Sequence, residues 1–287
     1  MPNLKVHTEY KIKSYKAVEP YMKSSEEFLH KNEPINNLFW EVYFRSSESM
    51  KEIHAGNIFH RGKIKLSYIK MTSDYILLSS GLSPTIQHLV DYGKRKKWIL
   101  RGVLGPSEMS ELFTKKWFES SGKNILLAQK TFNVFETRKT HLEFNQENRI
   151  KIVRADSKQW PRIRLWASLF AKESDCSSNE LSTVKLAREI LEQGNMYIFR
   201  KAGASVGMAG FGRKTPSRLT INMVYVSKEY RHQGYAKKMI YQLINEAKDR
   251  GFSKCILFSE KSLENNLYLQ IGCQFKGKLS EISFSKS

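Results

Sequence analysis

The stretch YRHQGYAKK, Tyr230 to Lys238, combines an arginine, a glycine and an alanine at a spacing that suits phosphate binding. The apolar, β-branched run from Leu219 to Ser227 precedes it and predicts a buried strand. Apolar residues at helical spacing follow it, and Gly251 stands where that helix would end. The pattern therefore predicts a strand, a tight turn and a helix, with the small residues in the turn.

Such a turn can bind a phosphate through its backbone. The first N–H groups of a helix have no partner within the helix and lie at its positive dipole end. Gly234 permits an unusual backbone conformation, Ala236 keeps the approach open, and Arg231 adds a permanent positive charge. An ordinary capped loop can carry the same residues, so it is the strand–turn–helix setting that favours a pyrophosphate site.

Composition and charge bear on whether the protein binds nucleic acid or a membrane. The chain has 287 residues, a net charge of +20 and a pI near 9.7, which suits either an anionic partner or a lysine-rich surface. The basic residues are spread along the chain, with the densest cluster at Gly93 to Trp98, and no nucleic-acid recognition motif accompanies them. No apolar run is long enough for a transmembrane helix, so we expect no membrane partner.

The cysteines indicate a reducing environment. Cys176, Cys255 and Cys273 are odd in number and widely spaced, so we expect a cytoplasmic protein without disulfides. The spacings typical of metal ligands do not occur, and we expect no metal site.

A polar segment divides the chain. Residues Glu136 to Asp156 show no apolar periodicity before Ile150 and predict a linker between an N-terminal α/β domain, 1–140, and a second domain, 149–287. Both halves are predicted to have a pair of helices, then strands, then alternating helix and strand, which suggests a degenerate structural duplication. In the second half we predict strands at Ile150–Arg154, Met196–Arg200, Ser205–Arg213, Leu219–Val226 and Lys254–Ser259, helices at Trp160–Glu173, Glu180–Gln193, Gly234–Asp249 and Ser262–Ile271, and a short terminal hairpin.

The second half resembles the GCN5-related N-acetyltransferase (GNAT) superfamily, and within it the glycine N-acyltransferase-like arm. The resemblance covers about Ile150 to Phe284, and the first half is similar to the amino-terminal halves of some bacterial members. It rests on spaced elements that agree with the expected structural units: Val224, Tyr225, Arg231, Gly234, Tyr235, Ala236, Gly251, Glu260, Asn265, Tyr268, Ile271 and Gly272.

The resemblance implies an α/β (α+β) fold with a mixed central sheet flanked by helices, and acetyl-CoA or another acyl-CoA as co-substrate. The first half lacks an Arg-x-x-Gly-x-Ala turn, so we expect no second cofactor site there. The implied cofactor-binding residues are Met223, Val224, Tyr225, Val226, Arg231, His232, Gln233, Gly234, Tyr235, Ala236 and Asn265. Asn265 could equally belong to the N-terminus of the last helix.

The same resemblance implies the catalytic groups. Tyr268 occupies the family's position for the acid that protonates the leaving thiolate. Either Glu260 or Glu173 could accept the proton of the attacking amine, directly or through water. Two departures affect the acceptor side: Glu260 replaces the usual Asp, and the loop after it is short and has no proline.

Three functions are therefore open. The first is an N-acyltransferase, acting most readily with acetyl, whose acceptor is a primary amine of a small molecule or peptide. The second is a coenzyme A-binding sensor or scaffold without turnover, which the shortened loop allows. The third is a basic nucleic-acid-binding protein. We favour the first.

Overall fold

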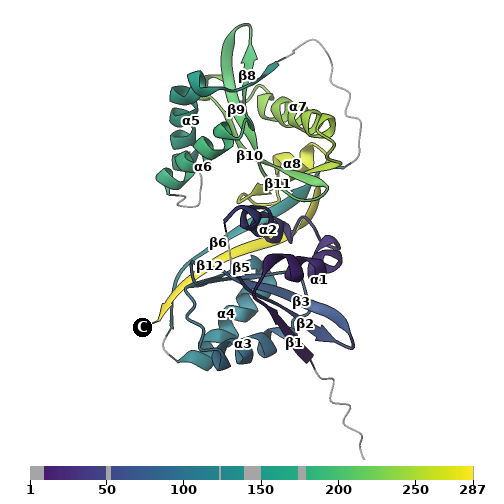
Figure 1. The fold of residues 1–287 in the computed structure, drawn as a ribbon. Helices are drawn as coiled ribbons and strands as arrows, with labels where there is room; N and C mark the ends of the chain where they lie inside the picture. Colours follow the sequence, from purple (N-terminus) through teal and green to yellow (C-terminus); the bar gives the residue numbers. More distant parts are fainter. Residues whose placement is uncertain (1–9, 50–52, 123, 139–149, 174–178, 287) are drawn as a thin grey trace, which may run out of the picture. The chain divides into compact units, whose positions relative to one another are not determined.

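The computed structural model describes residues 10–49, 53–122, 124–138, 150–173 and 179–286, and Figure 1 shows its fold. It forms two compact units: Met1–Phe132 with Gly277–Ser287, and Asn133–Lys276. The predicted boundaries, 1–140 and 149–287, divide the chain differently, because the last strand of each half extends into the other unit. Of the predicted linker, residues 139–149 lie outside the described residues, as does Cys176.

Unit 1 begins with an edge strand and a pair of helices. Its elements are β1 (Tyr10–Tyr15), α1 (Val18–His30), α2 (Asn37–Ser49), β2 (His54–His60), β3 (Lys63–Lys70), β4 (Tyr75–Leu78), α3 (Thr85–Arg95), β5 (Gly102–Pro106), α4 (Ser107–Ser121) and the first part of β6 (Asn124–Glu136). One apolar cluster joins α1 and α2 to the sheet, and a second joins α3 and α4 to it.

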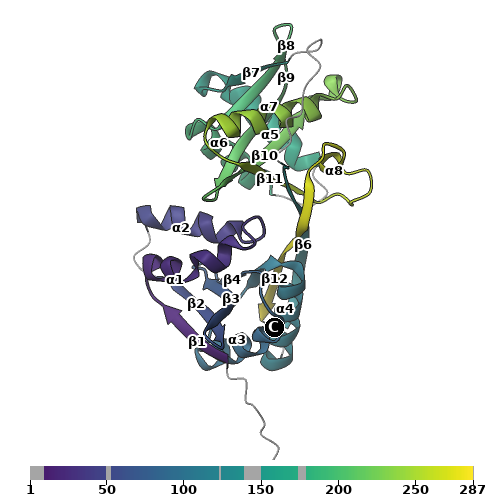
Figure 2. The ribbon, with the colours of Figure 1, turned by 90° about the vertical axis from the view of Figure 1, so that its right-hand side faces the viewer.

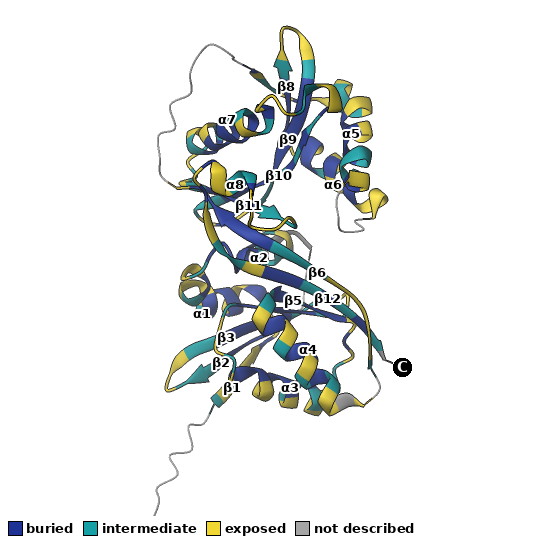
Figure 3. Ribbon diagram, turned by 180° about the vertical axis from the view of Figure 1, so that it is seen from behind, coloured by how far each residue is buried: buried dark blue, intermediate teal, exposed yellow. Residues whose placement is uncertain are grey.

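Unit 2 repeats this order of elements. It contains β7 (Lys151–Arg154), α5 (Trp160–Glu173), α6 (Glu180–Glu192), β8 (Met196–Lys201), β9 (Ala204–Lys214), β10 (Arg218–Val226), α7 (Tyr235–Asp249), β11 (Lys254–Ser259), α8 (Leu267–Gln270) and the first part of β12 (Gln274–Lys286). Helices α5 and α6 cover one face of β8–β10, and α7 covers the other (Figure 1). The strands between them are largely buried (Figure 3).

The predicted fold class is confirmed as mixed α/β. Twelve strands are hydrogen-bonded in the order β1-β2-β3-β4-β5-β12-β6-β11-β10-β9-β8-β7. In this order β12, the last strand of the second half, lies beside β5, and β6, the last strand of the first half, lies beside β11. The two halves have thus exchanged their final strands, which Figure 2 shows as the long ribbons of β6 and β12.

Two local predictions were wrong, and one apolar run of the first half is divided by a turn. The run Ile58–Met71 forms parts of two strands, because Arg61 and Gly62 adopt left-handed conformations (φ 49° and 73°) and form a hairpin turn. The predicted helix Ser262–Ile271 is only α8, because Asn265 is left-handed (φ 53°) and Asn266 caps a helix that starts after it. The predicted terminal hairpin is one strand, β12.

Candidate active site

The site is built where β10 leaves its parallel neighbour. Strands β10 and β11 pair only over Arg218–Thr220 and Lys254–Ile256, whereas β10 stays paired with β9 as far as Val226. The described part of the chain has no β10–β11 pair beyond Thr220. One backbone edge of β10 after Thr220 is therefore available to a ligand that can hydrogen-bond as a strand does.

A β-bulge reorients the end of β10. The register with β9 shifts between Asn222 and Tyr225, and Met223 adopts a left-handed conformation with φ 55°. Before the bulge, Leu219 and Ile221 face the α7 side of the sheet. An extra residue reverses the alternation of a strand, so the valines Val224 and Val226 take that face, and Met223 and Tyr225 face α5.

An ion cluster holds the paired ends of β10 and β11 together. The Glu136 side chain is 2% exposed, and its carboxylate accepts from Arg218 Nε at 2.5 Å and from Lys254 Nζ at 2.6 Å. Burial alone would raise the pKa of the Glu136 carboxyl, but the hydrogen bonds from Lys254 and Arg218 hold this pKa below its usual value. The two strands are therefore joined at one end and diverge at the other.

The predicted turn leads from the divergent end of β10 into α7. Gly234 caps the helix in the left-handed region (φ 75°, ψ 9°), and His232 is also left-handed (φ 60°). His232, Gln233 and Gly234 are exposed, and a Cβ added at Gly234 would meet no atom within 4 Å. The first N–H groups of α7, at Tyr235 and Ala236, thus lie at an open and exposed turn.

Two lysines reinforce the positive end of α7. Lys201 Nζ and Lys238 Nζ lie 5.4 and 5.3 Å from the ring centre of Tyr235, the first residue of the helix. Tyr235 itself is buried. The open glycine, the helix N-terminus and these two cations together suit a polyphosphate.

Arg231 is held beside the turn by protein groups. Its Nε donates to the Val226 carbonyl at 3.0 Å, and its Nη2 donates to Glu173 Oε2 at 2.7 Å. Lys228 Nζ lies 3.9 Å from the other oxygen of Glu173. Glu173, at the end of α5, is therefore part of an ion pair that ties this helix to the end of β10.

Tyr268 packs beside the end of β10. It is half-buried in the same apolar cluster as Val224 and Val226, and its ring packs edge-on against Phe135 with centroids 5.3 Å apart. Burial, with a smaller effect of the Cys273 sulfur, raises the pKa of Tyr268 to about 12. The hydroxyl is therefore protonated at neutral pH.

The remaining predicted residues lie in the connection between β11 and α8. Glu260 directly follows β11 and is half-buried. The Asn265 side chain is exposed, whereas its neighbour Asn266 is buried and accepts from the Tyr268 N–H at 3.0 Å. Asn266, which the sequence analysis did not single out, is thus the helix cap.

The two cysteines in the described residues are part of the core. Cys255 and Cys273 are both buried, and burial raises the pKa of each thiol to about 12. They are therefore protonated at neutral pH and act as packing residues.

The corresponding turn of unit 1 is closed by hydrogen bonds to other segments of that unit. Ser80 N donates to Asn36 Oδ1 at 2.9 Å, and Leu82 N donates to the Lys65 carbonyl at 3.0 Å. A Cβ added at Gly81 would lie 2.4 Å from the same carbonyl oxygen. This turn before α3 therefore lacks the space and the available N–H groups that the turn before α7 offers.

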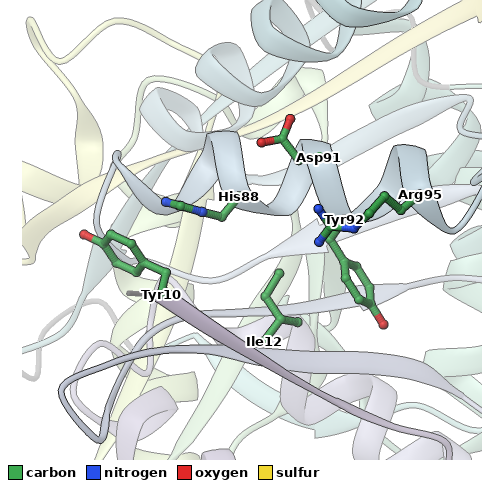
Figure 4. Close-up of a pocket in the computed structure, with 6 residues that line it drawn as sticks. All are labelled: Tyr10, Ile12, His88, Asp91, Tyr92 and Arg95. Atoms are coloured by element: carbon green, nitrogen blue, oxygen red, sulfur yellow. The ribbon is translucent and has the colours of Figure 1, made fainter. Parts of the chain in front are cut away.

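Unit 1 does have a surface cavity of about 250 Å³ between β1 and α3 (Figure 4). The ring of Tyr10 packs against His60 and His88, with centroids 4.9 and 4.6 Å away. The residues that line the cavity are Tyr10, Ile12, His88, Asp91, Tyr92 and Arg95. None of these residues belongs to the predicted site.

Comparison with known proteins agrees with the geometry of unit 2. Residues 160–270, from α5 through α8, match the model of the acetyltransferase (GNAT) family. This segment is a GNAT acetyltransferase domain. Among curated proteins, no significant match to the chain is found.

Several solved structures are similar in fold to nearly the whole chain, including the part outside the GNAT domain. A GNAT-family acetyltransferase from Colwellia psychrerythraea is 12% identical, with a TM-score of 0.55, over 96% of this chain and 100% of its own. A GCN5-related N-acetyltransferase from Sphaerobacter thermophilus is 11% identical, with a TM-score of 0.57, over 96% and 95%. A Drosophila protein is 10% identical, with a TM-score of 0.61, over 96% and 98%. At these identities the likeness establishes the fold.

Within the GNAT domain, the structure brings most of the predicted residues to one place. The bulge of β10, the turn before α7 and the valines that pack with Tyr268 all lie at the end where β10 and β11 diverge. Residues that the sequence analysis missed are Lys201, Lys238 and Asn266. The described helices are all too short or too polar to cross a lipid bilayer.

Proposed function

We propose that the GNAT domain transfers an acyl group, most readily acetyl, from acyl-coenzyme A to a primary amine of a small molecule or peptide. The observation that carries this proposal is the divergence of β10 from β11 after Thr220, which ends at the open turn before α7. The unpaired backbone edge suits the two amide groups of the pantetheine arm. The turn suits the pyrophosphate.

The residues of this region fit acyl-coenzyme A along its length. Met223 to Val226 offer backbone groups to the pantetheine arm. His232 to Ala236 offer N–H groups to the pyrophosphate, and Lys201 and Lys238 add positive charge beside it. A backbone N–H near Met223 or Val224 would polarise the thioester carbonyl.

The chemistry follows from the placement of Tyr268 and the glutamates. Acyl-coenzyme A supplies a thioester, whose C–S bond breaks as the amine nitrogen bonds to the acyl carbon. We assign to Tyr268 the donation of its proton to the departing sulfur, since the raised pKa keeps that proton in place at neutral pH. We assign to Glu260, directly or through water, the acceptance of the amine proton.

Glu173 receives a different role in this proposal. Its Oε2 accepts from Arg231 and its Oε1 faces Lys228 Nζ, so both oxygens of the carboxylate already contact cations of the protein. We therefore propose that Glu173 positions Arg231 and the end of β10. The relation to the glycine N-acyltransferase-like arm, the location in the cytoplasm and the class of acceptor, a primary amine, remain predictions from the sequence.

A coenzyme A-binding sensor without turnover is the second candidate. The observation in its favour is that α8, which carries Tyr268, has only four residues, Leu267–Gln270. The two functions differ in whether product forms, so product must be assayed with a panel of primary amines, alongside cofactor binding.

Thermal unfolding with and without acetyl-coenzyme A tests the cofactor site. At about 100 times its dissociation constant, the ligand should stabilise the wild type by about 2.7 kcal/mol. Gly234→Trp should lose this shift, because a large side chain would fill the open turn. A Gly234→Trp protein that folds and still shows the full shift would contradict the assignment of the turn.

Gly251 provides a matched control. It lies at the other end of α7, has φ 84°, and a Cβ added there would also meet no atom within 4 Å. Gly251→Trp therefore introduces similar backbone strain and the same side chain without approaching the turn. It should keep the ligand-induced shift.

A further inference from the structure

Asn133 is a buried polar residue that none of the roles above explains. It belongs to β6, the strand that begins in unit 1, and it pairs directly with Ser259, the last residue of β11. Its side chain is 7% exposed. Residues two apart in a strand have their side chains on the same face of the sheet. Asn133 therefore lies on the same face as Phe135, which contacts Tyr268.

The orientation of the Asn133 amide is determined by its partner. Its Nδ2 donates to the Lys261 carbonyl at 2.8 Å, and the reversed amide would place two oxygens together. Its Oδ1 is buried and has no hydrogen-bond partner among the described residues. A buried carbonyl without a hydrogen bond lowers the free energy of unfolding, so Asn133 is a poor choice for stability alone. Its specific contribution is the hydrogen bond to the Lys261 carbonyl.

The bonded carbonyl belongs to the segment that leads to Tyr268. Lys261 to Asn265 are exposed, so this segment has few contacts of its own. Its start is also held by the Lys261 N–H, which donates to Ser259 Oγ at 3.2 Å. At its end lies Asn266, whose Nδ2 donates to Ser259 Oγ at 3.2 Å and to the Ser262 carbonyl at 3.3 Å. Helix α8 has four residues, too few to be stable alone.

We propose that Asn133 is a positioning residue for Tyr268, supplied to the GNAT domain by the first half of the chain. Asn133 anchors the start of the segment, Asn266 anchors its end and accepts from the Tyr268 N–H, and Phe135 supports the ring. Two of these contacts, those of Asn133 and Phe135, come from strand β6. The inference rests on the proposed function, in which Tyr268 protonates the leaving sulfur.

A double-mutant cycle between Asn133 and Tyr268 tests the catalytic part. Asn133→Asp keeps the shape of the side chain but removes the donor that faces the Lys261 carbonyl. We expect kcat to fall about tenfold, with the KM for acetyl-coenzyme A unchanged within about twofold. In a Tyr268→Phe background the same change should alter kcat by less than about twofold, because the group that Asn133 positions is already missing.

Cleavage by trypsin after Lys261 tests the structural part without any turnover. We expect this site to be cut about tenfold faster in Asn133→Asp, because the segment opens more often. Asn57 is another buried asparagine, in unit 1, where its Nδ2 donates to Ser25 Oγ at 2.8 Å. Asn57→Asp should lower stability but leave both the cleavage rate after Lys261 and the kcat of the folded protein unchanged.

The outcomes separate this inference from the proposed function. If the wild type is active, two results overturn the inference alone. One is that Asn133→Asp lowers kcat by the same factor with and without Tyr268→Phe. The other is that trypsin cuts Asn133→Asp after Lys261 at the wild-type rate. A wild type that binds acetyl-coenzyme A but acylates no amine overturns the proposed function, and with it the catalytic role of Asn133. Faster cleavage together with a non-additive cycle supports both.

Discussion

Arg231 and Glu173 form an ion pair that connects the last turn of α5 to the last residue of β10. The guanidinium donates through Nη2 to Glu173 Oε2 at 2.7 Å and through Nε to the Val226 carbonyl at 3.0 Å. In the proposed function, the arginine of the phosphate-binding pattern therefore supports the cofactor turn from the side, and the nearby backbone N–H groups contact the phosphates.

Replacing Glu173 by glutamine should weaken cofactor binding more than it slows chemistry. Both partners of the ion pair are about one-third exposed, so the pair contributes modestly and its loss should raise the KM for acetyl-coenzyme A about two- to fivefold. We expect kcat to stay within about threefold of the wild type. Steady-state kinetics with a saturating acceptor would measure both constants.

Glu180 serves as the control for Glu173. It pairs with Lys172 across α5 and α6 at 3.5 Å, and among the described residues it bonds neither the turn nor β10. Glu180→Gln should leave both constants unchanged. If Glu173→Gln instead lowers kcat by about a hundredfold or more at constant KM, Glu173 is the base and its positioning role is wrong.

Replacing Tyr268 by phenylalanine should separate turnover from binding. Loss of a general acid typically lowers the rate by about 10²-fold or more, whereas the ring and its contact with Phe135 remain. The thermal shift with acetyl-coenzyme A should therefore persist. With a pKa of about 12, Tyr268 keeps its proton up to strongly alkaline pH, so its ionisation should not limit the wild-type rate between pH 7 and 10. A rate that falls through this range in the wild type but not in Tyr268→Phe would contradict this assignment.

Unit 2 should lose stability in alkaline solution. The pKa values of Cys255, Cys273 and Tyr268 are each raised by burial to about 12 in the folded state, from about 9 and 10 in the unfolded chain. A raised pKa means that the folded state holds the proton more tightly. The contribution of these groups is therefore complete below pH 9 and is lost as pH rises from 9 to 12.

Urea unfolding at a series of pH values would measure this loss. The slope should reach at most about 1.4 kcal/mol per pH unit for each group. Cys255→Ala should be less stable at pH 8, because it leaves a cavity, but its stability should fall less steeply above pH 9. An equal slope in the variant would show that Cys255 is not among the groups that titrate.

Replacing Glu136 by glutamine should destabilise the joined end of β10 and β11. The change leaves Arg218 and Lys254 without their shared counter-charge at a largely buried position, which should cost about 3 kcal/mol. The pKa of Glu136 is held below its usual value in the folded state, so its contribution is present above pH 4.5 and is lost as pH falls further. The difference in unfolding free energy between variant and wild type should therefore shrink in acid.

Glu119 is the control for Glu136. It pairs with Lys116 on the exposed face of α4 at 3.1 Å. Glu119→Gln should change the unfolding free energy by less than about 0.5 kcal/mol at neutral pH. A similar effect of the two substitutions would mean that burial of the Glu136 carboxylate does not matter.

Local signals in the sequence were sufficient to predict most of unit 2. Helix α5 and strand β11 have their predicted limits, Trp160–Glu173 and Lys254–Ser259, because apolar periodicity and β-branched runs are read within one element. The turn before α7 was predicted because glycine in the left-handed region and helix N-termini have recognisable residue patterns. The bulge at Met223 has no such pattern, since methionine rarely adopts a positive φ.

The strand exchange and the contacts of Asn133 could not be predicted from the sequence. Pairing of β12 with β5 joins Leu279 to Pro106, and pairing of β6 with β11 joins Asn133 to Ser259. Such pairings depend on register between segments that are far apart in the chain, and they leave no periodicity within either segment. Lys201, at the end of β8, escaped notice for the same reason, because only the fold brings it to α7.

The position of β12 has a consequence for synthesis of the protein. Residues 279–283 complete the sheet of unit 1 by pairing with residues 102–106, so the sheet of this unit is closed by residues that follow the whole second half in the sequence. On the ribosome, the first half must wait as an incomplete sheet with an open edge until residues 279–283 have been made. We expect the nascent first half to depend on chaperones, and removal of residues 278–287 to unfold the half that was made first.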